Sequence, residues 1–256
     1  MRIQYCSDLH LEFPQNAEWI NNNPLIPSGE ILIIAGDVAY LGDKFSENPF
    51  WDRVSEEFTQ VYVIPGNHDF YGGYDSGICL IKNYQEVIRD NVTLLNNAVV
   101  EHADCRLIFT SLWSFIEKEP EVIRESINDF RLIQYNKEKL TIHMFNEFYR
   151  ASMDFLLPEL QKKSDKKTVV VTHHLPSPQC IEEKYVGSPL TEAFCVDLTK
   201  EIETGFADFW IYGHSHGNIP DFTVGNTQLL TNQLGYVELG ESEKFDRTAV
   251  LDLKGH

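Results

Sequence analysis

Residues 61–69 read VYVIPGNHD, and this stretch holds both the element that decides the fold and the residues that point to a function. The apolar run Val61–Pro65 is short and rich in β-branched side chains, which predicts a buried strand. The block Gly66-Asn67-His68-Asp69 follows at once and offers an amide, an imidazole and a carboxylate. Average residue usage gives such a block by chance in roughly one chain in a thousand of this length. We therefore interpret it as a functional loop at the end of a strand.

Four more apolar runs along the chain end in residues that can bind a metal. Each of these blocks is a weak signal by itself, because short combinations of Asp, His and Gly arise often by chance. All of them in order, each after a predicted strand, are very improbable by chance. Loops at the carboxyl ends of parallel strands form the ligand sites of open α/β folds, so we expect one cluster. The four blocks are Asp8-Leu9-His10, Gly36-Asp37, His173-His174 and Gly213-His214-Ser215-His216.

Apolar runs alternate with helical patterns, which indicates an α/β fold, and a purely β tail from Thr227 indicates mixed sheets. No repeat and no Pro/Gly/Ser-rich linker divides the chain, so residues 1–256 are predicted to form one domain. The predicted strands are Arg2–Cys6, Glu30–Ala35, Val61–Pro65, Arg106–Thr110, Lys167–Thr172, Asp208–Tyr212, Thr227–Leu230 and Thr248–Leu253. The predicted helices are Pro49–Phe58, Ile78–Arg89, Leu140–Lys162 and a segment that begins at Ser188-Pro189 and ends at Gly205.

Acidic residues outnumber basic ones by 39 to 21, which gives a formal net charge of −18 at pH 7. Non-specific binding of nucleic acid needs a basic surface, and so does docking on anionic lipid, so both partners are disfavoured. No apolar stretch approaches the ~18 uncharged residues of a membrane-spanning helix. Phosphate chemistry remains open, because a bound metal reverses the local field. The expected partner is a small phosphorylated substrate, and the oligomeric state is left open.

The five cysteines are scattered and no pair has C-x-x-C spacing, which argues against a disulfide framework and against a thiolate zinc site. The first residues run directly into Ser7-Asp8, without the basic start, apolar run and cleavage site of a secretory signal. A reducing compartment is therefore predicted, and we expect a cytoplasmic protein.

The residue types in the five blocks indicate the kind of site. Carboxylate, imidazole and amide oxygen without thiolate suit Mn, Fe, Zn, Co or Ni. Seven candidate ligands exceed the four that one tetrahedral ion takes. They fit two divalent ions about 3.5–4 Å apart that share a bridging carboxylate. Glycines directly before Asp37, Asn67 and His214 fit tight turns with close backbone approach. The histidines outside the motifs are interpreted as surface or structural residues, and these are His102, His143 and His256.

The order D-x-H, G-D, G-N-H-[DE], a lone His and G-H-x-H resembles the signature of the calcineurin-like metallophosphoesterase superfamily. All five blocks are present between Asp8 and His216, so the resemblance covers nearly the whole chain. It implies a four-layer α-β-β-α sandwich, with two mixed β-sheets flanked by helices and a dimetal site at one edge.

The resemblance also implies a role for each motif residue. Asn67, His173 and His214 would hold one ion, Asp8, His10 and His216 the other, and Asp37 would bridge the two. The block His173-His174 leaves two candidates for one ligand, and His173 is favoured because it directly follows Val169–Thr172. His68 would face the substrate rather than a metal, and Asp69 could orient its ring.

The activity that the resemblance implies is hydrolysis of a phosphate ester by a hydroxide that bridges the two ions. His68 would stabilise the phosphoryl oxygens or protonate the leaving oxygen. Monoester and diester substrates both remain open. Gly36–Gly42 lacks the Asp-Arg pair that extends this block in the protein Ser/Thr phosphatases, which disfavours that activity. The alternative function is a catalytically silent scaffold of the same fold that binds a partner protein, which the complete set of motifs disfavours.

Specificity is expected from loops around the ions. Tyr71 could line the pocket, and Leu175–Ser188 could form a rim or lid over it. Trp113 could stack on a leaving group, although a packed core residue is the simpler interpretation. Arg131 could bind phosphate, although a solvated helix arginine is the simpler interpretation.

Overall fold

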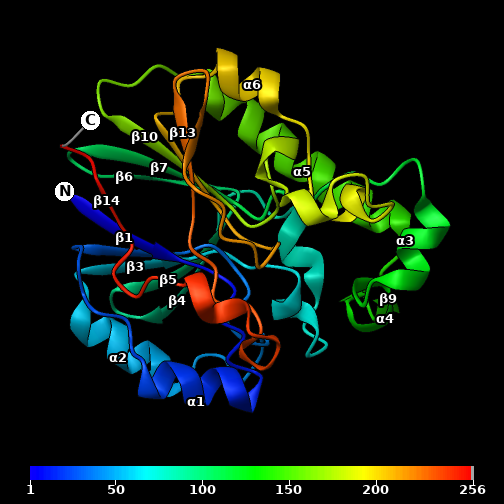
Figure 1. The fold of residues 1–256 in the computed structure, drawn as a ribbon, viewed down its shortest axis with the longest axis horizontal. Helices are drawn as coiled ribbons and strands as arrows, with labels where there is room; N and C mark the ends of the chain where they lie inside the picture. Colours follow the sequence, from blue (N-terminus) through cyan, green and yellow to red (C-terminus); the bar gives the residue numbers. More distant parts are fainter. Residues whose placement is uncertain (255–256) are drawn as a thin grey trace.

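Two six-stranded β-sheets pack face to face in the computed structural model, which describes residues 1–254 (Figure 1). The first sheet has the order β14-β1-β2-β3-β5-β4, and the second has the order β12-β13-β11-β10-β7-β6. Each sheet has four parallel strands at its centre and an antiparallel strand at each edge. The strands of the first sheet are β1 Arg2–Cys6, β2 Ile31–Ile34, β3 Gln60–Val63, β4 Tyr84–Arg89, β5 Val92–Asn96 and β14 Val250–Asp252. Those of the second are β6 Ala98–Glu101, β7 Cys105–Thr110, β10 Lys167–Thr172, β11 Phe209–Tyr212, β12 Phe222–Val224 and β13 Thr227–Thr231.

The central strands are buried on both faces. Val169 and Val171 of β10 pack between the sheets with Ile33 of β2, whereas Val170 packs with Leu156 on the outer side. Successive side chains of a strand point to opposite faces, so a continuous apolar run fills both the inner and the outer layer. The apolar runs of the sequence therefore predict these strands correctly, and the ends of all eight agree within two residues.

Helices cover the two outer faces. α1 and α2 lie against the first sheet, and α5 and α6 lie against the second (Figure 1). This arrangement confirms the predicted four-layer sandwich of two mixed sheets. Among residues 1–254, no helix has the length and hydropathy to cross a bilayer. The helices are α1 Pro14–Asn22, α2 Pro49–Glu57, α3 Pro120–Ser126, α4 Asp129–Leu132, α5 Ile142–Leu160 and α6 Thr199–Thr204, and a small hairpin, β8 Gln134–Tyr135 and β9 Glu138–Lys139, precedes α5.

The predicted helix over Ile78–Arg89 is wrong. Ser76–Leu80 form a short 3₁₀ helix, and Tyr84–Arg89 form the edge strand β4, which pairs with β5. The apolar residues of this segment do not form one buried stripe, because Ile81 is 47% exposed and Val87 is 70% exposed. Pairing along an open sheet edge overrides a helical pattern that has no buried face.

The predicted helix from Ser188 to Gly205 is wrong for most of its length. Only α6 is an α-helix, and it ends at Gly205 as expected. Upstream, the N–H of Leu175 donates to the carbonyl of Phe194 at 3.1 Å, and the N–H of Val196 donates to the carbonyl of Leu175 at 2.9 Å. These bonds hold residues 194–196 alongside Leu175, so a helix cannot run through them.

Candidate metal centre

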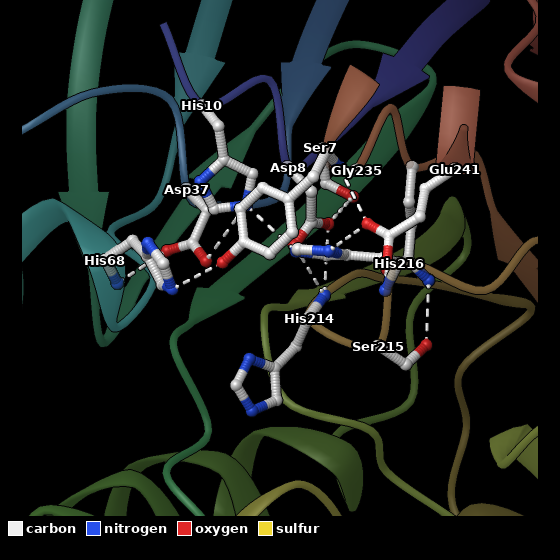
Figure 2. Close-up of polar contacts among 12 residues, drawn as sticks. Ser7, Asp8, His10, Asp37, His68, His214, Ser215, His216, Gly235 and Glu241 are labelled. Carbon is white, nitrogen blue, oxygen red and sulfur yellow. Dashed lines mark hydrogen bonds and ion pairs between the residues drawn. The ribbon is translucent and has the colours of Figure 1, made fainter. Parts of the chain in front are cut away.

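The five sequence blocks follow β1, β2, β3, β10 and β11, all at the carboxyl ends of parallel strands. Hydrogen bonds fasten the loops to one another. The N–H of Asp8 donates to the carbonyl of Gly36 at 3.0 Å, and the N–H of Gly213 donates to the carbonyl of His173 at 3.0 Å. The N–H of His214 donates to both carboxylate oxygens of Asp8 at 3.1 Å, which joins the two sheets. Figure 2 shows the resulting cluster of carboxylates and imidazoles.

A first group of possible ligands consists of Asp8, His10, Asp37 and His216, and one ligand atom of each lies within 4.8 Å of the others. His10 Nε2 and His216 Nε2 face each other at 2.9 Å. His216 Nε2 lies 3.5 Å from Asp8 Oδ1, and His10 Nε2 lies 3.8 Å from Asp37 Oδ2. These four side chains could hold one divalent cation.

A second group consists of Asp37, His173 and His214, again with ligand atoms within 4.8 Å of one another. His173 Nε2 lies 3.3 Å from Asp37 Oδ2 and 3.2 Å from Asn67 Oδ1, which adds the amide oxygen to this group. Asp37 belongs to both groups. Burial opposes its negative charge, but the rings of His173, His68 and His10 together outweigh this effect and hold the pKa of Asp37 well below its usual range.

Some buried polar atoms of the cluster lack hydrogen-bond partners in the protein, and bound cations would satisfy them. Within residues 1–254, Asp37 Oδ2 and His214 Nε2 are buried and make no hydrogen bond, which is costly unless a ligand satisfies them. Burial lowers the pKa of His214 well below its usual range, so its ring is neutral and can act as a ligand. Gly66 gives the cluster its space, because a Cβ at this position would lie 2.6 Å from His173 Cε1.

The backbone turns sharply at the strand ends. Five of the seven candidate ligands have a positive φ, between 48° and 77°, in the left-handed region that non-glycine residues rarely adopt. Each such backbone conformation costs about 1–3 kcal/mol of conformational free energy and persists only where the surrounding structure fixes it. Such conformations concentrate at functional sites. The five residues are Asp8, His10, Asp37, His214 and His216.

The geometry favours His173 over His174 as the ligand. The Nδ1 atom of His173 lies 2.8 Å from the carbonyl of Ala35, which orients Nε2 toward Asp37. Burial opposes protonation of this ring, but Asp37, Asp8 and the carbonyl of Ala35 together outweigh it and raise the pKa of His173 to about 9. A cation held by this ring would take the place of that proton, because a histidine ligand is neutral. The ring of His174 instead packs against Trp113, with centroids 5.2 Å apart, and burial lowers its pKa to about 3.

Comparison with known proteins assigns the chain to a family. Residues 1–218 match the sequence model of the calcineurin-like phosphoesterases. The chain belongs to this family. The uncharacterized protein L509 of Acanthamoeba polyphaga mimivirus is 32% identical over 283 residues, and the match covers 99% of this chain and 97% of that protein. The phosphopantetheinyl hydrolase PptH of Mycobacterium tuberculosis has the same fold, with a TM-score of 0.66 at 19% identity, over 94% of this chain and 92% of that one.

In this calcineurin-like chain, His68 lies beside the ligand groups and lines a cavity. Its Nε2 lies 3.0 Å from the hydroxyl of Tyr236, and its Nδ1 lies 3.5 Å from Glu12 Oε1. Burial opposes protonation of the ring, but the carboxylates of Glu12 and Asp37 outweigh it and raise the pKa of His68. The hydrogen bond to Tyr236 and the ion-pair contact with Glu12 thus hold the ring at the cavity.

The expectation that Asp69 orients the ring of His68 is wrong. The carboxylate of Asp69 accepts the backbone N–H of Gly66 at 2.6 Å and that of Asp37 at 3.0 Å. It also accepts two further N–H groups, from Val38 and Ala39. Asp69 therefore joins the Gly-Asp loop to the Gly-Asn-His-Asp loop, and Glu12 and Tyr236 orient the ring instead.

Three carboxylates that the sequence did not single out hold the outer atoms of candidate ligands. Glu12 Oε1 lies 3.0 Å from His10 Nδ1, and Glu241 Oε2 lies 2.7 Å from His216 Nδ1. Asp129 Oδ1 accepts the amide N–H of Asn67 at 2.9 Å. Such partners fix the orientation of metal ligands. Glu12 lies two residues after His10, so the sequence offered a signal for it, but the other two come from distant loops.

Removal of the Asp129 carboxylate is expected to weaken metal binding at the Asn67 side. A carboxylate only accepts hydrogen bonds, so Asp129 compels the NH₂ of Asn67 to face it and turns the amide oxygen toward His173. Asp129→Asn removes this constraint and should lower metal affinity by about 10–100-fold. Competitive metal titration measures the loss, and Asp154→Asn, an exposed position on α5, is the matched control. An unchanged affinity in Asp129→Asn would contradict the orienting role.

A cavity of about 420 Å³ opens onto the ligand groups. Tyr71 lines it, as expected, and the segment Leu175–Ser188 forms part of its rim. Trp113 is fully buried in the core cluster beside Phe145 and does not line the cavity. Arg131 is exposed and donates to the carbonyl of Glu125. The simpler interpretations of Trp113 and Arg131 are therefore correct.

Proposed function

We propose that this chain hydrolyses phosphate esters with the help of two divalent cations. The position of Asp37 carries the proposal, because its Oδ2 lies between His10 Nε2 and His173 Nε2, at 3.8 Å and 3.3 Å. A carboxylate shared between two sets of imidazoles is the arrangement that a pair of cations requires. In this proposal, one cation is held by Asp8, His10, Asp37 and His216, and the other by Asp37, Asn67, His173 and His214.

The side chains around the cavity suggest how the reaction proceeds. Bound cations would lower the pKa of a water molecule and neutralise charge on the phosphoryl oxygens. His68 would stabilise one of these oxygens or give its proton to the leaving oxygen. Glu12 and Tyr236 hold its ring in place before a substrate arrives, which reduces the reorganisation that the reaction needs.

The alternative of a catalytically silent scaffold has less support. A scaffold has no need for an oriented histidine beside a complete set of ligands, whereas a hydrolase needs both. Monoesters and diesters are equally compatible with the cavity, so the substrate panel includes both. It also includes a phosphopantetheinyl ester, because PptH, which shares the fold, is named for hydrolysis of that group.

Metal removal is expected to abolish activity, and reloading is expected to restore it with two ions per chain. The protein is stripped with a chelator and reloaded separately with Mn, Fe, Zn, Co or Ni. Elemental analysis then gives the number of ions, and the ester panel gives the rate with each metal. Full activity with a single ion per chain would contradict the shared role of Asp37. Two tightly bound ions without turnover of any ester would favour the scaffold.

We further propose a cytoplasmic setting and a small phosphorylated partner. Each of the five cysteines is free, and four of them are buried, which suits a reducing compartment. The net charge of −18 disfavours nucleic acid and anionic lipid as partners.

A further inference from the structure

The cavity beside the ligand groups is lined by two unlike sets of side chains. The first set is Asp37, Asn67, His68, His214 and His216. The second set is apolar or aromatic, comes from three separate parts of the chain and is called the apolar wall below. It consists of Tyr71, Ile127 after α3, and Ile181, Tyr185, Leu190 and Phe194.

The apolar wall is built into the fold. The ring of Phe194 stacks on that of His214, with centroids 4.6 Å apart and planes at 27°. The backbone bonds of Leu175 hold residues 194–196 in place. Glu182 packs so closely on Gly217 that a Cβ there would lie 2.6 Å from Glu182 Cδ. The apolar wall therefore has a fixed position relative to the candidate ligands, and its chemistry can select a substrate.

No lysine or arginine of the described chain lines the cavity. Basic residues of the neighbouring segments are engaged elsewhere. Lys184 Nζ lies 2.8 Å from Glu182 Oε2, and Arg124 donates to Glu121 at 2.6 Å. Arg131 donates to the backbone on the exposed surface. A second anionic group on a substrate would thus lie against the apolar wall without a lysine or arginine partner.

Carboxylates also line the cavity, so a second anion of a substrate would meet like charges. Glu182 lies beside Ile181 of the apolar wall. Asp129 and Glu241 line the cavity next to the candidate ligands, where they accept hydrogen bonds from Asn67, Tyr71 and the N–H of Tyr236. Burial of an unpaired charge next to like charges is unfavourable, whereas apolar area gains from burial here.

We propose that this cavity selects phosphate esters whose organic group is uncharged and largely apolar, and that it discriminates against esters with a second anionic group. The inference rests on the proposed function and specifies its substrate class. Polar groups that only exchange hydrogen bonds remain acceptable, because Ser126, Ser188 and Thr191 also line the cavity. Nucleoside polyphosphates and phosphorylated acids are thereby excluded as preferred substrates.

A matched set of three aryl phosphates tests the inference. The 4-ethylphenyl, 4-(2-carboxyethyl)phenyl and 4-(2-aminoethyl)phenyl esters have similar size, and two methylenes keep the charge away from the leaving oxygen. Each is assayed with the metal-loaded protein as monoester and as methyl diester, so the result does not depend on which kind is hydrolysed. We expect kcat/KM for the ethyl ester to exceed that for the carboxyethyl ester by about tenfold or more. The aminoethyl ester should be penalised less than the carboxyethyl ester.

A positive charge placed in the wall should reverse the discrimination. Ser126→Lys introduces it at an exposed position of the cavity, and Ile181→Lys introduces it on the opposite segment. Both should raise the carboxyethyl-to-ethyl ratio of kcat/KM. Val186→Lys is the matched control, because Val186 is 71% exposed, belongs to the same segment and does not line the cavity. This control should keep the ratio of the unmodified protein.

Binding measurements separate a failure of the selectivity from a failure of the proposed function. Non-hydrolysable phosphonate analogues of the three esters are titrated by calorimetry into the metal-loaded protein. Turnover of all three esters at equal kcat/KM would overturn the selectivity and leave the proposed function supported. If the analogues bind with affinities in the expected order, ethyl above aminoethyl above carboxyethyl, but no ester is turned over, the proposed function is overturned and the selectivity is supported. Equal affinities for the three analogues, together with no turnover of any ester, would overturn both the selectivity and the proposed function.

Discussion

Asp37→Ala is expected to remove both metal ions and to abolish hydrolysis. The carboxylate belongs to both ligand groups, and its Oδ1 also accepts the backbone N–H of His68 at 2.9 Å. One substitution therefore removes a ligand from each cation and loosens the loop that carries His68. The loss of turnover should exceed the roughly 10²–10⁴-fold that a general acid contributes. Elemental analysis and kcat/KM on the best ester of the panel measure the two effects.

Two further variants sharpen this test. Asp37→Asn retains the shape and an oxygen that can accept from His68, so it isolates the effect of the charge. Asp154→Asn, exposed on α5, is the control for loss of a carboxylate elsewhere. If Asp37→Asn bound two ions and turned over at the rate of the unmodified protein, the shared carboxylate would have no role in holding the cations.

His68→Ala is expected to retain both metal ions and lose turnover by about 10²–10⁴-fold. The ring lines the cavity and makes its contacts with Tyr236 and Glu12, whereas its neighbour Asn67 faces His173. Metal content, folding by circular dichroism and kcat/KM are measured together. His143→Ala, whose side chain is 81% exposed on α5, is the matched control. Loss of metal in His68→Ala would make His68 a ligand, contrary to the assignment.

The leaving group reveals how His68 acts. If His68 protonates the leaving oxygen, the loss should be largest for alkyl esters, whose alkoxide departs poorly, and should shrink for p-nitrophenyl esters. If it only stabilises the phosphoryl oxygens, the two losses should be similar. An unchanged rate on both ester types would remove His68 from the mechanism.

The central strands could be predicted because their pattern is local. A strand such as Lys167–Thr172, buried on both faces, is a short continuous apolar run whatever its neighbours are. The edge strand Tyr84–Arg89 lacks this property, since only Ile88 of its six residues is buried. Its partner β5 supplies the hydrogen bonds that define it, and the local sequence shows nothing of that pairing.

The candidate ligands could be predicted for a similar reason. Each follows a recognisable strand by one to four residues, so short motifs capture them. Asp129 and Glu241 belong to no motif, because loops from other parts of the fold bring them to Asn67 and His216. Asp69 lies inside a motif, but its role depends on which backbone groups surround it. The packing of two loops determines which backbone groups surround Asp69, and the spacing of residues along the chain does not reveal it.

The left-handed backbone of five candidate ligands, at the ends of three strands, places the evolution of this protein under two opposed pressures. Glycine at Asp8, His10, Asp37, His214 or His216 would relieve the strain and remove a possible ligand in the same step. Selection for heat resistance with a chelator present would therefore enrich variants that have lost the centre. The same selection with divalent metal present would retain it, because binding to the folded state offsets the strain. The metal supply of the cell would then decide whether a lineage under such selection keeps the metal centre or only the fold.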